Sequence, residues 1–134
     1  MKCDKISYAF CMDREKKMRD GFIKVCVCTP AVKVSDTETN GKEIRKMMKL
    51  ADEAGSRITV FPELCITGYS CRDLFLQKKL LDSAREELLK IAKESLGKNG
   101  IFFVGLPYLH NGKVYNVAAA INDGQVLGLV PKRN

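Results

Sequence analysis

The chain has 134 residues, of which 46% are hydrophobic and 29% are charged, and its formal net charge is +7. This length allows one domain at most, and the composition is ordinary for a folded globular protein, which argues against disorder. The longest apolar run, residues 101–106, is far too short to cross a bilayer, and the first residues lack the apolar core of a secretory signal. We therefore expect a cytoplasmic protein with no membrane partner.

The basic excess is spread along the chain, and most lysines and arginines lie near acids. Aromatic residues make up only 7%, without the basic and aromatic interleaving that is typical of single-strand binders. A solvated basic surface is the better interpretation, so we expect no nucleic-acid partner. A nucleic-acid binder remains the third-ranked alternative.

Six cysteines stand at positions 3, 11, 26, 28, 65 and 71. Nothing indicates an oxidising compartment, and the C-x-C spacing of Cys26 and Cys28 without a nearby histidine pair does not match a zinc site. The single histidine, His110, precedes a turn and has no second ligand at a suitable spacing. We expect free, mostly buried thiols and no metal.

The first 55 residues are expected to form an extension, a strand and a helix. Residues 1–20 are polar and charged without a sustained period, and we expect them to be disordered. Residues 22–28 (FIKVCVC) predict the first strand. Asn40, with a glutamate three residues later, resembles a capping box that opens a helix, and Gly55 is a suitable C′ residue for its end.

The central stretch is 57–73, RITVFPELCITGYSCRD. Residues 58–61 predict a buried strand, and Pro62 should end its regular pairing. Glu63 then lies at the carboxyl end of a strand, where open α/β sheets place their ligands. On position alone, a solvated loop glutamate is the commoner interpretation. Asp73 is a plausible helix N-cap.

The residues after 73 are expected to form a helix and three strands. Residues 74–80 are apolar enough to pack over the preceding loop, and a second helix runs from there to about residue 95. The spacing of its apolar residues places on one face Leu81, Ala84, Leu88, Ile91 and Ala92. A buried strand is expected at 101–106, and Pro107 should limit its extension. The strands joined by hairpins are expected near 102–109, 113–121 and 125–130. Asx–Gly pairs at 111–112 and 123–124 suit type I′ turns between antiparallel strands. The order β-α-β-α-β-β-β predicts a mixed α/β layered domain.

Two predicted strand ends carry an ionisable residue beside a proline, namely Glu63 in FPEL and Lys132 in VPKRN. A carboxylate and an ammonium that converge in a cleft could act as general base and electrostatic stabiliser. They would need a nucleophile between them, because neither residue alone hydrolyses an amide. For Lys132 by itself, an exposed terminal lysine is the commoner interpretation.

The combination of FPEL-x-x-x-GY, FFVGLP and YNVAAAI-x-x-G-x-VLG-x-VPK resembles the nitrilase (carbon–nitrogen hydrolase) superfamily. The added GYS-x-x-DLF-x-Q most closely resembles the amino-terminal glutaminase domains of glutamine-dependent NAD+ synthetases. The resemblance implies that residues 21–134 form part of a nitrilase-like α-β-β-α sandwich, with one mixed sheet and its helices. It also implies that Glu63 is the general base, Lys132 the lysine that stabilises the oxyanion, and Tyr69 a residue of the glutamine pocket.

The family's nucleophile is a cysteine thiolate, which attacks the side-chain amide of glutamine, releases ammonia and leaves a thioester for water to hydrolyse. That cysteine would follow a strand beyond the VPK motif, and none of the six cysteines matches its context. Cys65 is expected to be a packing or loop residue. The resemblance thus implies a truncated fragment that is inactive alone, with no nucleophile of its own.

The parent enzyme implied by the resemblance amidates nicotinic acid adenine dinucleotide. It would use ATP and magnesium in an absent synthetase domain, so this segment is expected to bind no cofactor. Its partners would be glutamine, the rest of the same polypeptide and further copies in a homo-oligomer.

Two alternatives stay open besides the nucleic-acid binder. One is another amidase of the same superfamily, with the same roles for glutamate and lysine. The other is a non-catalytic interaction module, because half a sandwich exposes an apolar face that must find a partner. Arg72 could reach a substrate, although a surface salt bridge is its commoner fate.

Overall fold

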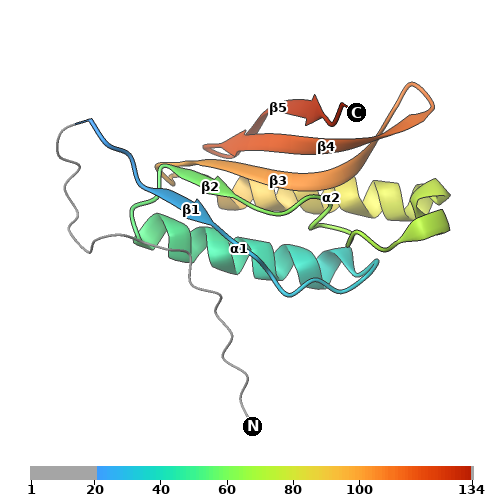
Figure 1. Ribbon diagram of the computed structural model, residues 1–134, viewed down its shortest axis with the longest axis horizontal. Helices are drawn as coiled ribbons and strands as arrows, with labels where there is room; N and C mark the ends of the chain where they lie inside the picture. The colour runs from blue at the N-terminus through green and yellow to red at the C-terminus, as the bar shows by residue number, and fades with distance from the viewer. Residues whose placement is uncertain (1–20, 134) are drawn as a thin grey trace, which may run out of the picture.

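The computed structural model describes residues 21–133, so the expected disorder of residues 1–20 concerns a segment outside the described part (Figure 1). The elements, in chain order, are β1 (Val25–Val27), α1 (Thr37–Glu53), β2 (Ile58–Val60), the 3-10 helix η1 (Arg72–Leu76), α2 (Lys78–Glu94), β3 (Ile101–His110), β4 (Lys113–Asn122) and β5 (Gln125–Pro131). The predicted order is confirmed, and η1 is added to it. Over residues 21–133, no helix combines the length and apolarity needed to span a membrane.

The strands form one mixed sheet in the order β1-β2-β3-β4-β5. The first three are parallel, and two hairpins make β4 antiparallel to both β3 and β5. Both helices lie on the same side of this sheet (Figure 1). Because β4 runs against both β3 and β5, strands β2 and β5 point the same way. Their carboxyl ends therefore reach the same edge of the sheet.

Helix α1 begins earlier than the sequence predicted, and the cap assigned to Asn40 was wrong. Asp36 is the N-cap, and its carboxylate accepts the Thr39 N–H at 3.0 Å, which lowers the pKa of Asp36. Asn40 is fully buried inside the helix. Its amide donates to the carbonyls of Lys33 and Ile66, and its oxygen accepts the Lys33 N–H. The side chain thus ties together two loops instead of capping its own helix.

The predicted turn residues adopt the backbone that their positions require. Gly55, with φ +79°, follows the C-cap of α1. Asn111 and Gly112 both have positive φ, as do Asp123 and Gly124. Positive φ at both central positions defines the type I′ turn, whose twist matches that of the flanking strands.

Strand β3 continues through Pro107, so the limit expected there was wrong, whereas the hairpin strand expected near 102–109 is confirmed. Pro107 pairs with Asn116, whose carbonyl accepts the Lys132 N–H and therefore faces β5. The missing N–H of Pro107 would accordingly point away from β4. On that other side β2 pairs only with residues 101–103, so no ladder hydrogen bond is lost.

The cap predicted at Asp73 was also wrong. Asp73 is not a cap, because η1 starts at Arg72 with no side-chain cap and Asp73 lies within it. Of the apolar residues at 74–80, Leu80 is buried, whereas Leu76 is 81% exposed. The apolar face predicted for α2 is buried as expected, at Leu81, Ala84, Leu88, Ile91 and Ala92.

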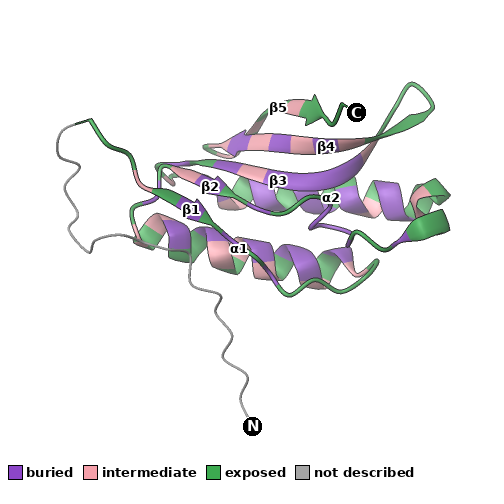
Figure 2. Ribbon diagram, viewed as in Figure 1, coloured by how far each residue is buried: buried purple, intermediate pink, exposed green. Residues whose placement is uncertain are grey.

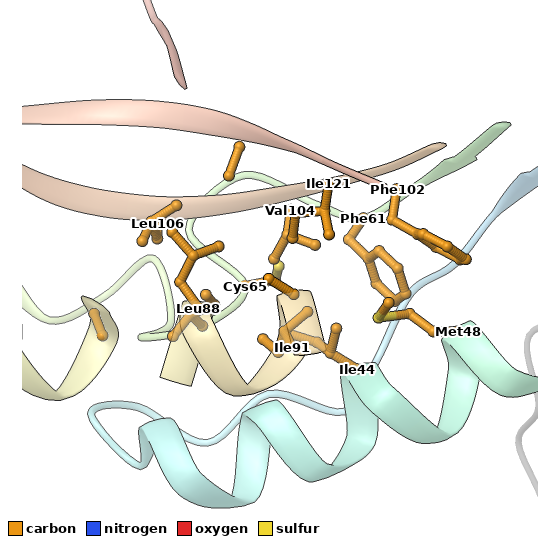
Figure 3. Packing of buried hydrophobic residues seen from close by; sticks show 14 of the residues in the cluster. Ile44, Met48, Phe61, Cys65, Leu88, Ile91, Phe102, Val104, Leu106 and Ile121 are labelled. Atoms are coloured by element: carbon orange, nitrogen blue, oxygen red, sulfur yellow. The ribbon is translucent and has the colours of Figure 1, made fainter. Parts of the chain in front are cut away.

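The core lies between the sheet and the two helices, which turn their buried faces toward it (Figures 2 and 3). Its largest buried apolar side chains are Ile44, Met48, Ile66, Ile91, Phe102, Val104, Leu106 and Ile121. Side chains alternate along a strand, so the residues between these on β3 and β4 face the opposite side of the sheet. That opposite face carries the site described below.

Four of the thiols are buried and free, as predicted: Cys26, Cys28, Cys65 and Cys71. Burial raises the pKa of Cys28 to about 11 and that of Cys65 to about 12. Such thiols are almost entirely protonated near neutral pH and are poor nucleophiles.

Candidate active site

Glu63 and Lys132 lie together although they are 69 positions apart in the chain. The Nζ atom of Lys132 is 3.0 Å from Oε1 and 3.2 Å from Oε2 of Glu63. Glu63 follows β2, and Lys132 is the first residue after β5. Both side chains keep access to solvent, at 39% and 54% exposed. The two residues singled out at strand ends therefore share one site.

Their contact needs an explanation, because two strands separate β2 from β5. At the usual strand spacing of about 4.8 Å, the two strand ends would lie roughly 14 Å apart. The loop after β2 closes this gap by lying against β3. The Ile66 N–H donates to the Gly105 carbonyl at 3.3 Å. A Cβ atom at Gly105 would stand only 2.5 Å from the Leu64 nitrogen and 2.6 Å from the Pro62 oxygen. A glycine in β3 thus allows the loop to carry Glu63 toward β4 and β5.

Asn116 of β4 is the third member of the site, and no role was predicted for this residue. Its side-chain amide donates a short hydrogen bond to Oε1 of Glu63. Val117 beside it is buried in the core, so Asn116 projects from the opposite face of the sheet. The sequence did hold an indication, because asparagine is depleted in strands and this one interrupts an otherwise apolar run.

The two donors act together on the carboxyl group. The Lys132 ammonium, and after it the Asn116 amide, lower the pKa of Glu63 below its ordinary value. A carboxyl whose pKa is lower in the folded than in the unfolded chain stabilises the fold above the unfolded pKa. That contribution is lost as the pH falls through the lowered pKa. Near neutral pH, Glu63 is therefore an ionised carboxylate.

The pair lines an open hollow of about 580 Å³. Its described lining residues are Glu63, Leu64, Tyr69, Ser70, Arg72, Phe75, Asn116 and Lys132. Tyr69, the predicted pocket residue, is 70% exposed here. Arg72 has φ +47° and forms no ion pair with residues 21–133, so the surface salt bridge expected for it was wrong.

None of those lining residues is a cysteine. Cys65 follows Glu63 closely in sequence, but it is 1% exposed and its thiol is directed at the Gly105 carbonyl, 3.6 Å away. This agrees with the packing role predicted for Cys65. Residues 21–133 also contain no group of three or more histidine, cysteine or acidic side chains that could hold a metal ion. His110 is exposed at the end of β3, directly before the turn.

One protein family matches almost the whole of the described chain. The sequence pattern of the carbon–nitrogen hydrolases matches residues 24–134. This chain belongs to the carbon–nitrogen hydrolase family. The region matched to the family includes Glu63, Asn116 and Lys132.

Two relatives of this chain are named glutamine-dependent NAD(+) synthetase. The protein from Mycobacterium bovis is 38% identical over 112 residues, which are 84% of this chain and 16% of that protein. The protein from Saccharomyces cerevisiae is 37% identical over 97 residues, which are 72% of this chain and 14% of that protein. The chain thus spans less than a fifth of the length of these relatives.

Solved structures support the predicted fold class. A glutamine-dependent NAD(+) synthetase from Cytophaga hutchinsonii superposes with a TM-score of 0.79 at 32% identity, covering 84% of this chain and 19% of that one. An amidase from Nesterenkonia sp. superposes with a TM-score of 0.71 at 20% identity, covering 90% of this chain and 46% of that one. The mixed sheet with its helices is therefore part of a nitrilase-type fold, as predicted.

Proposed function

We propose that residues 21–134 are the amino-terminal part of a nitrilase-like glutaminase domain, and that the whole protein is a glutamine-dependent NAD+ synthetase. Glutamine hydrolysis would supply ammonia for the ATP-dependent amidation of nicotinic acid adenine dinucleotide. The observation that carries the proposal is the contact of Glu63 with Lys132, at the ends of two strands that point the same way. The names of the relatives support the choice of glutamine and of the second reaction.

In this proposal Glu63 is the general base and Lys132 stabilises the oxyanion. A cysteine outside residues 21–133 supplies the thiol, because none of the cysteines among them reaches the hollow. Glu63 takes the thiol proton while the sulfur attacks the carbonyl carbon of the glutamine side chain, and the proton then passes to the departing amine. Water hydrolyses the thioester, and glutamate leaves. Lys132 offsets the negative charge on the carbonyl oxygen in both steps.

The observed ion pair fits the resting stage of such a reaction. While Lys132 lies against Glu63, the pKa of the carboxyl stays low and Glu63 is a weak base. When a developing oxyanion draws the ammonium away, Glu63 loses its closest positive charge and becomes a stronger base. Both side chains are partly exposed, so this exchange of partners breaks no buried contact.

Tyr69 would line the glutamine pocket, since it borders the same hollow as the charged pair. We propose no cofactor or metal for this segment, and we place ATP and magnesium in the synthetase domain. The partners would be the remainder of the polypeptide and further copies in a homo-oligomer. We also propose a cytoplasmic location, with no membrane and no nucleic acid among the partners.

The test uses the protein made from its complete coding sequence. We expect Glu63→Gln and Lys132→Ala each to lower glutamine-dependent NAD+ formation by roughly 100-fold or more, the contribution typical of a general base or an oxyanion donor. With ammonium chloride in place of glutamine, both variants should form NAD+ at the wild-type rate. Loss of both reactions together, or of neither, would contradict the proposed roles.

The matched control is the ion pair between Glu38 and Lys42, which is exposed on α1 and lies outside the hollow. Glu38→Gln and Lys42→Ala should leave both reactions unchanged. The 134-residue chain alone should release no glutamate from glutamine. Release that Glu63→Gln abolishes would place the nucleophile within this chain. Hydrolysis of simple amides without NAD+ formation would favour the amidase alternative.

A further inference from the structure

Asn116 touches both members of the charged pair, through different groups. Its side-chain amide donates to Oε1 of Glu63, and its backbone carbonyl accepts the Lys132 N–H at 2.8 Å. Strand β5 ends at Pro131, which pairs with Val117, so the bond from Asn116 extends the pairing of β4 by one residue. One residue of a central strand thus holds the side chain of the acid and the main chain of the lysine.

The bonds on the carboxylate are distributed unequally. Oε1 of Glu63 accepts from both Asn116 and Lys132, whereas Oε2 accepts from Lys132 alone. If the ammonium moves away, Oε1 keeps the amide as a donor and Oε2 has none. The amide does not titrate, so it holds Oε1 at any pH. The free oxygen, Oε2, is then the better acceptor for a proton.

We propose that Asn116 is the positioning residue of this site. Its side chain fixes the Glu63 carboxylate so that Oε2 takes up the proton. Its backbone carbonyl anchors the main chain of Lys132 so that the ammonium reaches the carboxylate. This proposal rests on the proposed function in one respect, namely that the proton taken up by Glu63 comes from the attacking thiol. The geometry itself is independent of that function, and so is its first test. The other charged or titratable groups around the hollow are Tyr69 and Arg72.

The first test follows the carboxyl carbon of Glu63 by NMR during a pH titration of the 134-residue chain. We expect Asn116→Ala to raise the pKa of Glu63 toward its ordinary value, because one of its two donors is lost. Asn116→Asp should raise it further, because a second carboxylate replaces the amide. If Asn116→Ala does not fold, Asn116→Ser, which is smaller and polar, takes its place.

The matched control is Asn122, a half-buried asparagine on the same strand whose amide donates to the Gly100 carbonyl at 2.9 Å. Asn122→Ala should leave the titration of Glu63 unchanged. The comparison is repeated with Lys132→Ala in the background. An effect of Asn116→Ala that persists there is direct, whereas one that vanishes would show that Asn116 acts only through the lysine and would overturn the side-chain part of the proposal.

The second test is kinetic and uses the complete protein. We expect Asn116→Ala to lower kcat with glutamine by about 10-fold or more, as loss of orientation does, and to leave the ammonia-driven reaction unchanged. An unchanged titration of Glu63 in folded Asn116→Ala would overturn the positioning role. If that titration shifts as expected but Glu63→Gln keeps full glutamine-dependent activity, the proposed function fails and the geometric assignment stands.

Discussion

Gly105 in β3 is the position at which a single methyl group should disturb the site most. A Cβ atom there would lie 2.5 Å from the Leu64 nitrogen, 2.6 Å from the Pro62 oxygen and 2.9 Å from the Glu63 carbonyl carbon. All three atoms belong to the backbone, so no side chain can rotate away to make room. We predict that Gly105→Ala forces the loop away from β3 and carries Glu63 with it.

The size of that movement follows from the contact distances. Ordinary contact with a Cβ atom begins near 3.4 Å, so relief of the 2.5 Å contact needs a shift of about 0.9 Å. A shift of that size along the bonds would lengthen the two Lys132 contacts of Glu63 from 3.0 and 3.2 Å to about 3.9 and 4.1 Å, and the Asn116 contact from 2.5 Å to about 3.4 Å. The flexible Lys132 side chain can follow part of the way, but Asn116 is held on an interior strand. Both donors should therefore bind the Glu63 carboxylate more weakly.

Two measurements check this prediction. Urea unfolding followed by circular dichroism should show a loss of roughly 1–3 kcal/mol for Gly105→Ala, the usual cost of overpacking. The NMR titration should show the pKa of Glu63 moving up toward its ordinary value. The control is Gly128→Ala in β5, where no described atom lies within 4 Å of the added methyl group and the free energy of unfolding should change by about 0.5 kcal/mol or less. Equal stability of the two variants, with Glu63 unaffected in both, would refute the reasoning.

Three further predictions concern buried groups away from the hollow. Asn40→Ala should lower the free energy of unfolding by about 2–3 kcal/mol in urea, because three hydrogen bonds to loop backbone are lost together. Glu87→Ala should cost roughly 2–4 kcal/mol in the same assay, since it leaves Arg45, 20% exposed, without its partner between the helices. Cys65 should resist alkylation by iodoacetamide at pH 8 in the folded chain, because the pKa of its thiol is raised to about 12, and should react in urea. Peptide mass spectrometry would measure the alkylated fraction.

The elements that the sequence predicted well are those whose causes are local. Both hairpin turns need only an asparagine or aspartate followed by glycine, so 111–112 and 123–124 could be read directly from the chain. The apolar face of α2 depends on spacing alone. The predicted helix start at Asn40 was wrong because tertiary contacts determine where this helix begins. The Asn40 side chain is fully buried and hydrogen-bonded to two loops, and Asp36 is the cap.

The site was predictable only in part, for the same reason. The resemblance identified Glu63 and Lys132, and the same direction of two strands explains why they meet. The need for glycine at 105 arises from a loop that lies more than 40 positions earlier in the sequence, and no local pattern marks such a close approach. Asn116 lies within the YNVAAAI motif, but its bond to Glu63 depends on which face of β4 it occupies and on the path of that loop.

The ion pair does not hold this site together. Glu63 and Lys132 are both partly exposed, and pairs of that kind contribute little to stability. The loop is held instead by its buried residues, with Cys65 at 1% and Ile66 at 0% exposed, and by the backbone bond from Ile66 to Gly105. Because the backbone fixes the geometry, the two charges can separate without loosening the fold. In the proposed reaction the base and the oxyanion donor exchange partners during every turnover, and a site anchored in this way permits that exchange.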